Sequence, residues 1–523
     1  MKIKITLFYS IIAASILFSC VSKEKFNAKI RAKHSLIELK EDLAVLKTSL
    51  EEGHPGLYWY ISKEKLDFKF DSIRNLLSDS TTSIQFYRMV APLVSEVKCG
   101  HTRLVYPGLK YTKAQKDSSK KAGPAPLSQI YYHIDSNKIF VESVNNKDLL
   151  KHLKATEILA IDSVPAIEII KKTKDLFGSD GYNLTFKDHV LTKSFAAYYY
   201  LQYSRKDSST LQLKKIDKPD SIFNYVLKTI KPVKLKGEVK KLSKEELKKK
   251  EIARKLAKKQ KKKNKYKGFD TDGSSILSLT YDSVLKSTAI MKVKSFSADA
   301  ANHNKFFKES FAELQVKNIQ NLIIDLRDNG GGRLTACNKL FRYLYDYGHV
   351  YTGRADMVNR YFSSSKYIDH RGLNGYKSPF RMLFVKKDTT GYYTSFSTSK
   401  VLNPLDNNFK NNLIVLINGY SFSATSLLSA NLQQVNRGVF VGEETGGGYN
   451  KCTAGTMPFI NLPNTKLRLR LPLKVIQTTN QRKLEGRGVF PQYPVAETIQ
   501  DILDKKDVVM EKAKELISEK QID

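Results

Sequence analysis

The chain has 523 residues, of which 41% are hydrophobic, so it is too long for one compact core and should fold as about two to four domains. Its formal net charge is +36, and part of this charge lies between residues 231 and 267, which hold 18 Lys and Arg against four Glu. Apart from Tyr266, this tract has no aromatic residues that could stack on bases, so we do not expect a nucleic-acid-binding protein. We interpret the tract as a solvated helix or a disordered insertion, with contact to an anionic lipid or polysaccharide as the alternative.

The first twenty residues have the organisation of a secretory signal. A basic start is followed by an apolar run, residues 5–18, that is too short to span a bilayer comfortably. The run ends in Leu17-Phe18-Ser19-Cys20, which resembles the bacterial lipobox. This resemblance implies a lipoprotein signal peptide over residues 1–19 and a lipid anchor at Cys20 in the bacterial cell envelope. No acidic cluster follows Cys20, so we expect an outer-membrane lipoprotein on the periplasmic face; a plain cleaved signal is the alternative.

Residues 20–105 are expected to form a polar tether followed by a helical region. Apolar residues recur at helical spacing before and after a break at Gly53-His54-Pro55-Gly56. The two apolar faces consist of Leu39, Leu43, Leu46 and Leu50, and of Tyr87, Val90, Leu93 and Val97.

Residues 106–230 are expected to form a small β-rich module. The stretch ATEILAIDSVPAIEII predicts a strand over residues 157–161, a turn, and a helix from Ala166 to Lys174. It resembles the strand, turn and helix of a PDZ domain, although Ser163 stands where glycine is commoner in the turn. The resemblance implies capture of an extended peptide by strand addition. An ordinary hairpin followed by a helix is the alternative.

After a Lys-rich insertion, residues 231–270, the segment 271–495 alternates between strands and helices, which favours layered α/β packing. The last segment, residues 496–523, is expected to form one amphipathic helix from Ile499 to Ile517. Within the α/β segment we expect strands at Ala289–Val293, Leu322–Leu326 and Leu413–Ile417, and helices at Asn304–Val316 and Leu334–Tyr345.

Two turns in this segment could carry chemistry. In NLIIDLRDNGGGRLTA, a buried strand leads into Asn329-Gly330-Gly331-Gly332 and then a helix, where backbone amides and a helix dipole could hold an anion or an oxyanion. In INGYSFSATSLLSA, Ser423 lies at the turn between a buried strand and a helix. Such a turn can expose a nucleophile, but N-capping of the helix is an equally ordinary role for serine. A third turn, VGEETGGGYNK, supplies Glu443, Glu444 and Lys451.

The order of these three turns resembles that of the tail-specific, or C-terminal processing, serine peptidases. The resemblance covers about residues 36–495, with the basic tract as an insertion. It implies a multidomain α+β protein with a crotonase-like α/β peptidase core, a helical N-terminal region and a PDZ-like module. It also implies that Ser423 is the nucleophile and that amides of Gly330, Gly331 and Ala424 form the oxyanion hole.

The family activates its serine in two ways. One branch uses a lysine beyond the nucleophile, but Gly448 stands at that position and Lys451 lies three residues further on. The branch of the tricorn core and the retinoid-binding protein uses a histidine before the PDZ-like module and a carboxylate near the end of the core. VKCGHTRLVY supplies His101 for this branch, and LEGRGVFPQYP supplies Glu485, although Gln492 replaces the usual aspartate.

The resemblance therefore implies Ser423 as nucleophile, His101 as general base and acid, and Glu485 as the orienting carboxylate, with Glu443 and Lys451 as alternatives. We expect an envelope lipoprotein serine endopeptidase that cleaves unfolded or extended polypeptides through an acyl-enzyme, with no metal or cofactor. Cys99, Cys337 and Cys452 are expected to be free thiols, because their spacing fits neither a zinc site nor a disulfide framework. A catalytically inactive peptide- or ligand-binding lipoprotein on the same fold is the alternative. The oligomeric state stays open.

Overall fold

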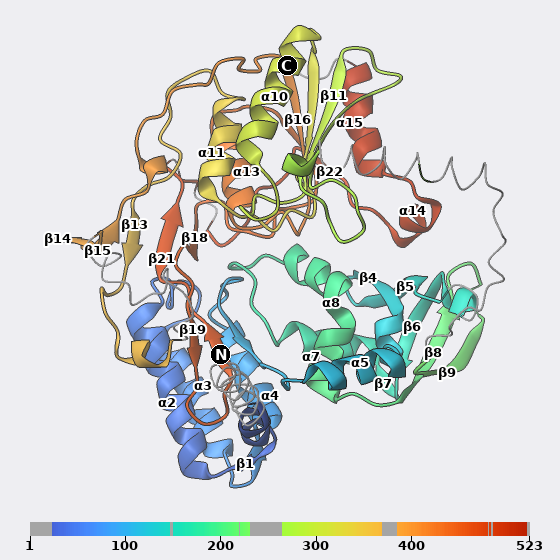
Figure 1. The fold of residues 1–523 in the computed structure, drawn as a ribbon, viewed down its shortest axis with the longest axis vertical. Helices are drawn as coiled ribbons and strands as arrows, with labels where there is room; N and C mark the ends of the chain where they lie inside the picture. Colours follow the sequence, from blue (N-terminus) through green and yellow to red (C-terminus); the bar gives the residue numbers. More distant parts are fainter. Residues whose placement is uncertain are drawn as a thin grey trace, which may run out of the picture.

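The computed structural model describes most of the chain beyond the predicted leader (Figure 1). Cys20 and most of the Lys-rich insertion lie outside the described residues, so the predictions for them are not addressed by the fold. In the part of the chain that is described, no helix is long and apolar enough to cross a membrane. The described residues are 23–146, 150–218, 220–230, 251, 264–368, 384–479, 481–482 and 485–519.

A six-stranded sheet forms the centre of the α/β core. Its first two strands are antiparallel and all its other neighbours are parallel. The order across the sheet is β10 (Leu277–Tyr281), β11 (Thr288–Val293), β12 (Asn321–Asp325), β16 (Asn412–Ile417), β17 (Val439–Gly442) and β22 (Tyr493–Pro494).

Helices cover both faces of this sheet, as the predicted layered packing requires (Figure 1). Alternate residues of β12 face opposite ways: Leu322 and Ile324 belong to one apolar cluster and Ile323 to another. The first cluster contains α10 (His303–Val316), α11 (Leu334–Arg342) and α13 (Ala424–Gln434); the second contains α15 (Val508–Ser518). The turns after β12 and β16 lie side by side because these parallel strands are neighbours.

The N-terminal region is helical, as predicted, and it is joined to the far end of the core. It contains α2 (Leu36–Gly53), α3 (Lys63–Leu76), α4 (Ser83–Ser95) and the pair β1 (Lys33–His34) and β2 (Thr81–Thr82). Both predicted apolar faces are buried, and α2 ends at the predicted break. A three-stranded sheet, β19 (Phe459–Asn461), β20 (Arg468–Arg470) and β3 (Arg103–Val105), connects this region to residues of the core more than 350 positions away.

The segment between residues 106 and 230 forms a sheet with two helices. Its strands are β4 (Ile130–Asp135), β5 (Lys138–Val144), β6 (Thr156–Ile161), β7 (Val164–Pro165), β8 (Ser208–Lys215) and β9 (Ile222–Lys228), with α7 (Ala166–Lys174) and α8 (Thr185–Tyr203). α5 (Lys113–Ala122) precedes them. Asp162 and Ser163 both have positive φ, +50° and +68°, which explains why glycine would suit this tight hairpin. The PDZ-like identity of the segment stays a prediction.

Two predicted helices differ from the structure. α11 ends at Arg342, three residues before the predicted Tyr345. The predicted C-terminal helix is two helices, α14 (Ile499–Asp504) and α15, because Lys505 has a left-handed backbone conformation and Asp507 caps α15. The small sheets β13 (Ala355–Met357), β15 (Gly391–Thr394) and β14 (Lys386–Asp388), and β18 (Lys451–Ala454) with β21 (Lys474–Gln477), complete the described strands.

Candidate active site

Ser423 lies at the turn between β16 and α13 in a strained backbone conformation. Its φ of +59° and ψ of −123° belong to a region that non-glycine residues rarely adopt, at a cost of about 1–3 kcal/mol. Its side chain makes no capping hydrogen bond to the helix. The capping role considered from the sequence is therefore wrong for this serine, whose hydroxyl does not bond to the start of α13.

The neighbouring hydroxyls are buried, and three of them bond to the backbone. Ser421 donates to the carbonyl of Leu326 at 2.8 Å, which ties the serine turn to the glycine loop after β12. Ser426 donates to the carbonyl of Ser421 and accepts from the amide of Gly447. Ser429 donates within α13. Ser423 is the partly exposed serine of this stretch.

His101 faces Ser423. Its Nε2 lies 2.9 Å from Oγ of Ser423, where the imidazole can accept the hydroxyl proton. The ring packs on Phe422 at 4.6 Å between centroids, and Phe422 stacks on Phe186 of α8 at 4.4 Å. Gly100 makes this packing possible, because a Cβ there would lie 2.7 Å from the ring of Phe422. The structure thus brings together two residues that are 322 positions apart in the sequence.

The surroundings of His101 keep its ring neutral. Burial, together with the charges of Arg470 and Arg103, lowers the pKa of His101 to about 3. A neutral imidazole is ready to accept a proton at pH 7. The imidazolium that forms during attack would need a negative charge nearby, because its Nδ1 is buried and has no hydrogen-bond partner.

The structure does not bring either predicted glutamate to that nitrogen. Glu485 is about half exposed, and its carboxylate pairs with Nζ of Lys451 at 3.4 Å. Lys451, the alternative activating group, is thereby held by Glu485 and also lies over the ring of Trp59. Glu443 pairs instead with His189 of α8 at 2.7 Å.

Asp180 is the carboxylate that the structure places beside His101, and it was not predicted from the sequence. One of its oxygens lies within 4.8 Å of a ring nitrogen of His101 and of Sγ of Cys99. It accepts hydrogen bonds from the amides of Gly100 and Gly448, at 2.8 and 3.3 Å. Burial raises its pKa to about 6. It therefore holds the backbone next to His101 and can supply negative charge near the ring.

Cys99, His101 and Asp180 are also residue types that could hold a metal ion. In the structure Sγ of Cys99 is already 2.8 Å from the hydroxyl of Thr453, and both oxygens of Asp180 accept backbone amides. Burial raises the pKa of the Cys99 thiol to about 11, so it is not a thiolate near neutral pH. We interpret the cluster as a hydrogen-bonded support for His101.

Two amides are free to stabilise an oxyanion, and a third predicted one is occupied. The amides of Gly330 and Ala424 donate to no acceptor in the described structure, and Ala424 is the first residue of α13. The amide of Gly331 donates to the side chain of Asn329 at 2.9 Å, so this part of the predicted oxyanion hole is wrong. Gly331 instead allows the glycine loop to approach Ser423 closely, because a Cβ at this position would lie 2.8 Å from Cβ of Ser423.

Residues 287–495 match the family model described as "Peptidase family S41". The chain carries an S41 peptidase domain. This domain contains Ser423, Glu485 and both glycine turns, whereas His101 and Asp180 lie upstream of it in the sequence.

Relatives of the S41 domain agree with this assignment. The Tail-specific protease of Haemophilus influenzae is 25% identical over 234 residues, which are 44% of this chain and 27% of the relative. The match thus spans about a quarter of that protein. Crystal structures of mature CPAF, alone and complexed with lactacystin, share the fold, with TM-scores of 0.59 and 0.60 over 92% of this chain and 97% and 98% of theirs. Their sequence identities are 14% and 15%. The predicted resemblance to the tail-specific serine peptidases is confirmed at the level of the family.

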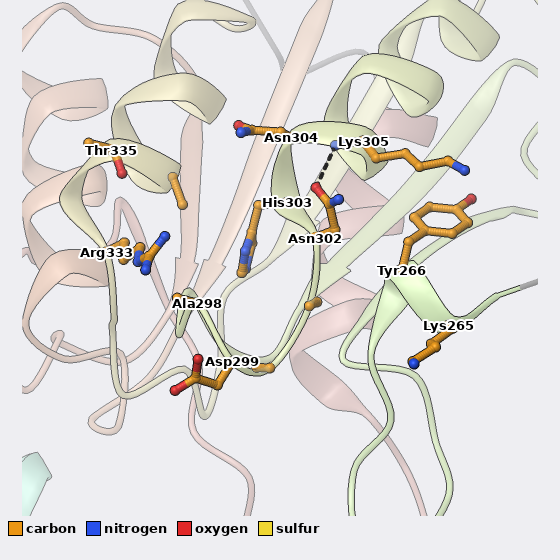
Figure 2. Close-up of a pocket in the computed structure, with 13 residues that line it drawn as sticks. Lys265, Tyr266, Ala298, Asp299, Asn302, His303, Asn304, Lys305, Arg333 and Thr335 are labelled. Carbon is orange, nitrogen blue, oxygen red and sulfur yellow. Dashed lines mark hydrogen bonds between the residues drawn. The ribbon is translucent and has the colours of Figure 1, made fainter. Parts of the chain in front are cut away.

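A cavity of about 690 Å³ lies beside the glycine loop of the S41 domain (Figure 2). Arg333 and Thr335, just after Gly332, line one part of it, and residues around the start of α10 line another. Neither Ser423 nor His101 lines this cavity, so the contact between them lies outside it.

Proposed function

We propose that the chain is a serine endopeptidase of the bacterial cell envelope that cleaves unfolded or extended polypeptides. The observation that carries this proposal is the 2.9 Å contact between a strained, partly exposed Ser423 and a buried, neutral His101, next to two unoccupied amides. A hydroxyl is a poor nucleophile until a base removes its proton, and this geometry supplies that base. Backbone strain of the kind found at Ser423 clusters at functional sites, which supports a functional role for this turn.

The proposed reaction follows from these contacts. Oγ of Ser423 attacks the carbonyl carbon of the scissile bond while Nε2 of His101 takes its proton. The negative oxygen of the tetrahedral intermediate lies against the amides of Gly330 and Ala424, each worth on the order of 3 kcal/mol in the transition state. His101 then gives its proton to the leaving amine, which leaves an acyl-enzyme. Water, activated in the same way by His101, attacks the acyl carbon and releases Ser423.

The third member of the site is proposed to be Asp180, in place of the predicted Glu485. The carboxylate of Asp180 is buried next to His101, whereas Glu485 faces Lys451 and is about half exposed. A charge in a dry surrounding stabilises the imidazolium more than one in water. Asp180 is a positioning residue in this proposal, since it acts on the substrate through His101.

The location is proposed from the sequence. The basic and apolar start and the lipobox-like Leu17-Phe18-Ser19-Cys20 support a lipid anchor at Cys20 in the outer membrane, on the periplasmic face. Metabolic labelling with an alkyne fatty acid, compared between wild type and Cys20→Ser, tests the anchor.

The enzymatic proposal is tested with the chain lacking residues 1–20, since the described structure begins at residue 23. We expect fragments from a chemically unfolded protein by mass spectrometry and labelling of Ser423 by a fluorophosphonate probe. Ser423→Ala and His101→Ala should each abolish both, while Ser429→Ala, which alters a hydroxyl bonded only within α13, should keep both. Cleavage that survives Ser423→Ala would overturn the nucleophile. Neither cleavage nor labelling in the wild type would favour a non-catalytic binding protein.

A further inference from the structure

Two arginines stand directly opposite each other beside the catalytic pair. Arg103 of β3 and Arg470 of β20 are register partners in an antiparallel pair of strands, so their side chains leave the same face of the sheet. Arg468 lies two residues before Arg470 on β20 and adds a third cation to that face. Like charges in directly opposed positions destabilise a sheet. The arrangement therefore calls for a compensating anion.

The described part of the chain supplies no such anion. None of its carboxylates lies within 4.0 Å of the guanidinium of Arg103 or Arg470. Arg470 donates to the thioether sulfur of Met457 at 3.2 Å, which is a weak acceptor. Two other arginines of low exposure do have carboxylate partners: Arg327 pairs with Asp325 and Asp507, and Arg487 pairs with Glu444. Arg103 and Arg470 differ from these in that they face each other across the strand pair without such a partner among the described residues.

This pair lies near His101. Arg103 follows His101 by two residues, and the charges of Arg470 and Arg103 both act on His101. Burial raises the pKa of Tyr198 and Tyr420, and the charge of Arg103 opposes that rise in both. Tyr420 lies three residues before Ser423 on the same turn. Arg103 is exposed and Arg470 is partly buried, so an incoming group can reach both.

We propose that Arg103 and Arg470 form a substrate subsite for a carboxylate next to the scissile bond. A planar guanidinium matches the two oxygens of a carboxylate, and two of them on one face give a site for a single anion. In a polypeptide substrate the carboxylate is an Asp or Glu side chain or the free C-terminus. The proposal rests on the proposed peptidase function and adds to it a preference for acidic or chain-terminal substrates.

The subsite also bears on catalysis. A carboxylate between the arginines cancels positive charge that now disfavours protonation of His101. His101 is then a stronger base when such a substrate is bound than when a neutral one is bound. The preference for a carboxylate should consequently appear in kcat as well as in KM.

Matched peptides test the subsite. One arm scans Glu against Gln through four positions on each side of the cleaved bond, and the other compares a free C-terminal carboxylate with an amide. We expect one position or the terminus to favour the carboxylate at least tenfold in kcat/KM. Arg103→Gln and Arg470→Gln should each reduce that preference to about threefold or less. Arg333→Gln, an exposed arginine that lines the cavity in Figure 2, should leave it unchanged.

Two controls separate this inference from the proposed function. Fluorophosphonate labelling of Ser423 in each arginine variant shows that the site is still folded. Binding of the same peptides to Ser423→Ala by fluorescence anisotropy measures the subsite without any cleavage. Equal cleavage or equal binding of acidic and neutral peptides, or a preference that survives both arginine variants, would overturn the subsite and leave the peptidase standing. A preference in binding with no cleavage in the wild type would overturn the peptidase and leave the subsite.

Discussion

At the scale of single residues, Ser423 and His101, which lie in contact in the structure, were both predicted from the sequence, but the carboxylate beside them was not. Ser423 and His101 were found because glycines and small residues mark both turns, and these marks are local. Asp180 could not be found, because its partners are backbone amides of Gly100 and Gly448, which any residue type supplies. Glu485 matched a motif, yet its carboxylate faces Lys451. Arg103 and Arg470 pair across 367 positions, which no local pattern reveals.

The backbone strain at Ser423 predicts a gain in stability when the serine is replaced by glycine. Glycine adopts φ of +59° without the steric cost that Ser423 bears. The free energy of unfolding of Ser423→Gly, measured in urea, should therefore be about 1 kcal/mol higher than that of Ser423→Ala. Both variants should lack activity. Ser426→Gly, inside α13, should lose about 1 kcal/mol or more, since glycine is unfavourable in a helix and a hydrogen bond is lost. A Ser423→Gly variant less stable than Ser423→Ala would contradict the strain.

The position of Asp180 predicts the acid limb of the pH profile. Burial raises the pKa of this carboxyl to about 6, so it becomes negative, and able to stabilise protonated His101, as the pH rises through about 6. The rate kcat/KM should rise through the same range, and Asp180→Asn should lose this limb together with about 10²-fold or more in kcat. Glu485→Gln is the comparison. If the acid limb were unchanged in Asp180→Asn and absent in Glu485→Gln, Glu485 and not Asp180 would be the carboxylate that supports His101.

The carboxyl of Asp180 should also make the stability of the fold depend on pH, in the direction opposite to that of the rate. Its folded pKa is raised, so its contribution to stability is complete below about pH 4 and falls as the pH rises through about 6. The shift corresponds to roughly 3 kcal/mol. Between pH 4.5 and 7.5, the free energy of unfolding measured in urea should therefore decrease less in Asp180→Asn than in the wild type.

At the scale of elements, buried strands and glycine turns were predictable, and their partners were not. The runs that became β12 and β16 are apolar along their whole length because helices cover both faces of the sheet. α8 was missed: its residues include Phe195, Tyr198, Tyr199 and Tyr200, which favour strands when taken alone. The single C-terminal helix was wrong because a tertiary contact of Asp507, which sequence periodicity does not register, starts α15 anew.

That contact makes Asp507 the link between α15 and the six-stranded sheet. Its carboxylate caps α15 and pairs with Arg327, which follows β12 and also binds Asp325. Asp507→Ala should lower the free energy of unfolding by about 2 kcal/mol or more, because a cap is lost and a largely buried guanidinium loses one partner. Urea denaturation at pH 7 measures this. Asp504→Ala, an exposed carboxylate one turn earlier, should change stability by less than about 0.5 kcal/mol.

At the scale of the whole molecule, the contact between Ser423 and His101 depends on parts of the chain that are far apart. His101 comes from the N-terminal region, Ser423 from the α/β core, and Phe186 of α8 supports both through Phe422. Sequence analysis divided the chain into consecutive domains. In the structure Leu469 and Leu471, from the predicted core, pack in one apolar cluster with the N-terminal helices. Domain boundaries drawn along the sequence cannot describe this mixing of the two regions, because β3 and β20 are far apart in the sequence and pair only in the folded chain.

The contact between α8 and the core predicts that Glu443 affects the cleavage of large substrates but not the chemical step at Ser423. Glu443 pairs with His189 of α8, and Lys193 of α8 pairs with Asp328 after β12. Glu443→Gln weakens this joint without altering the contact between His101 and Ser423. Cleavage of a long unfolded protein should fall about five- to tenfold, while fluorophosphonate labelling of Ser423 should change less than twofold. His189→Gln should have the same effect, and the double variant should add little, as expected for partners in one interaction.

The joint should also depend on pH. Burial alone would lower the pKa of His189, but Glu443 outweighs it and raises that pKa above 6.5; burial likewise opposes the lowering of the Glu443 pKa by His189. The charged pair is thus present between about pH 4.5 and 6.5 and is lost as the pH rises through the raised pKa of His189. In the wild type, the opening equilibrium of α8 measured by hydrogen exchange should increase as the pH rises through the raised pKa of His189. In Glu443→Gln this opening equilibrium should depend little on pH. Slow labelling of Ser423 in Glu443→Gln would instead place Glu443 in the chemical step and refute its assignment to the joint.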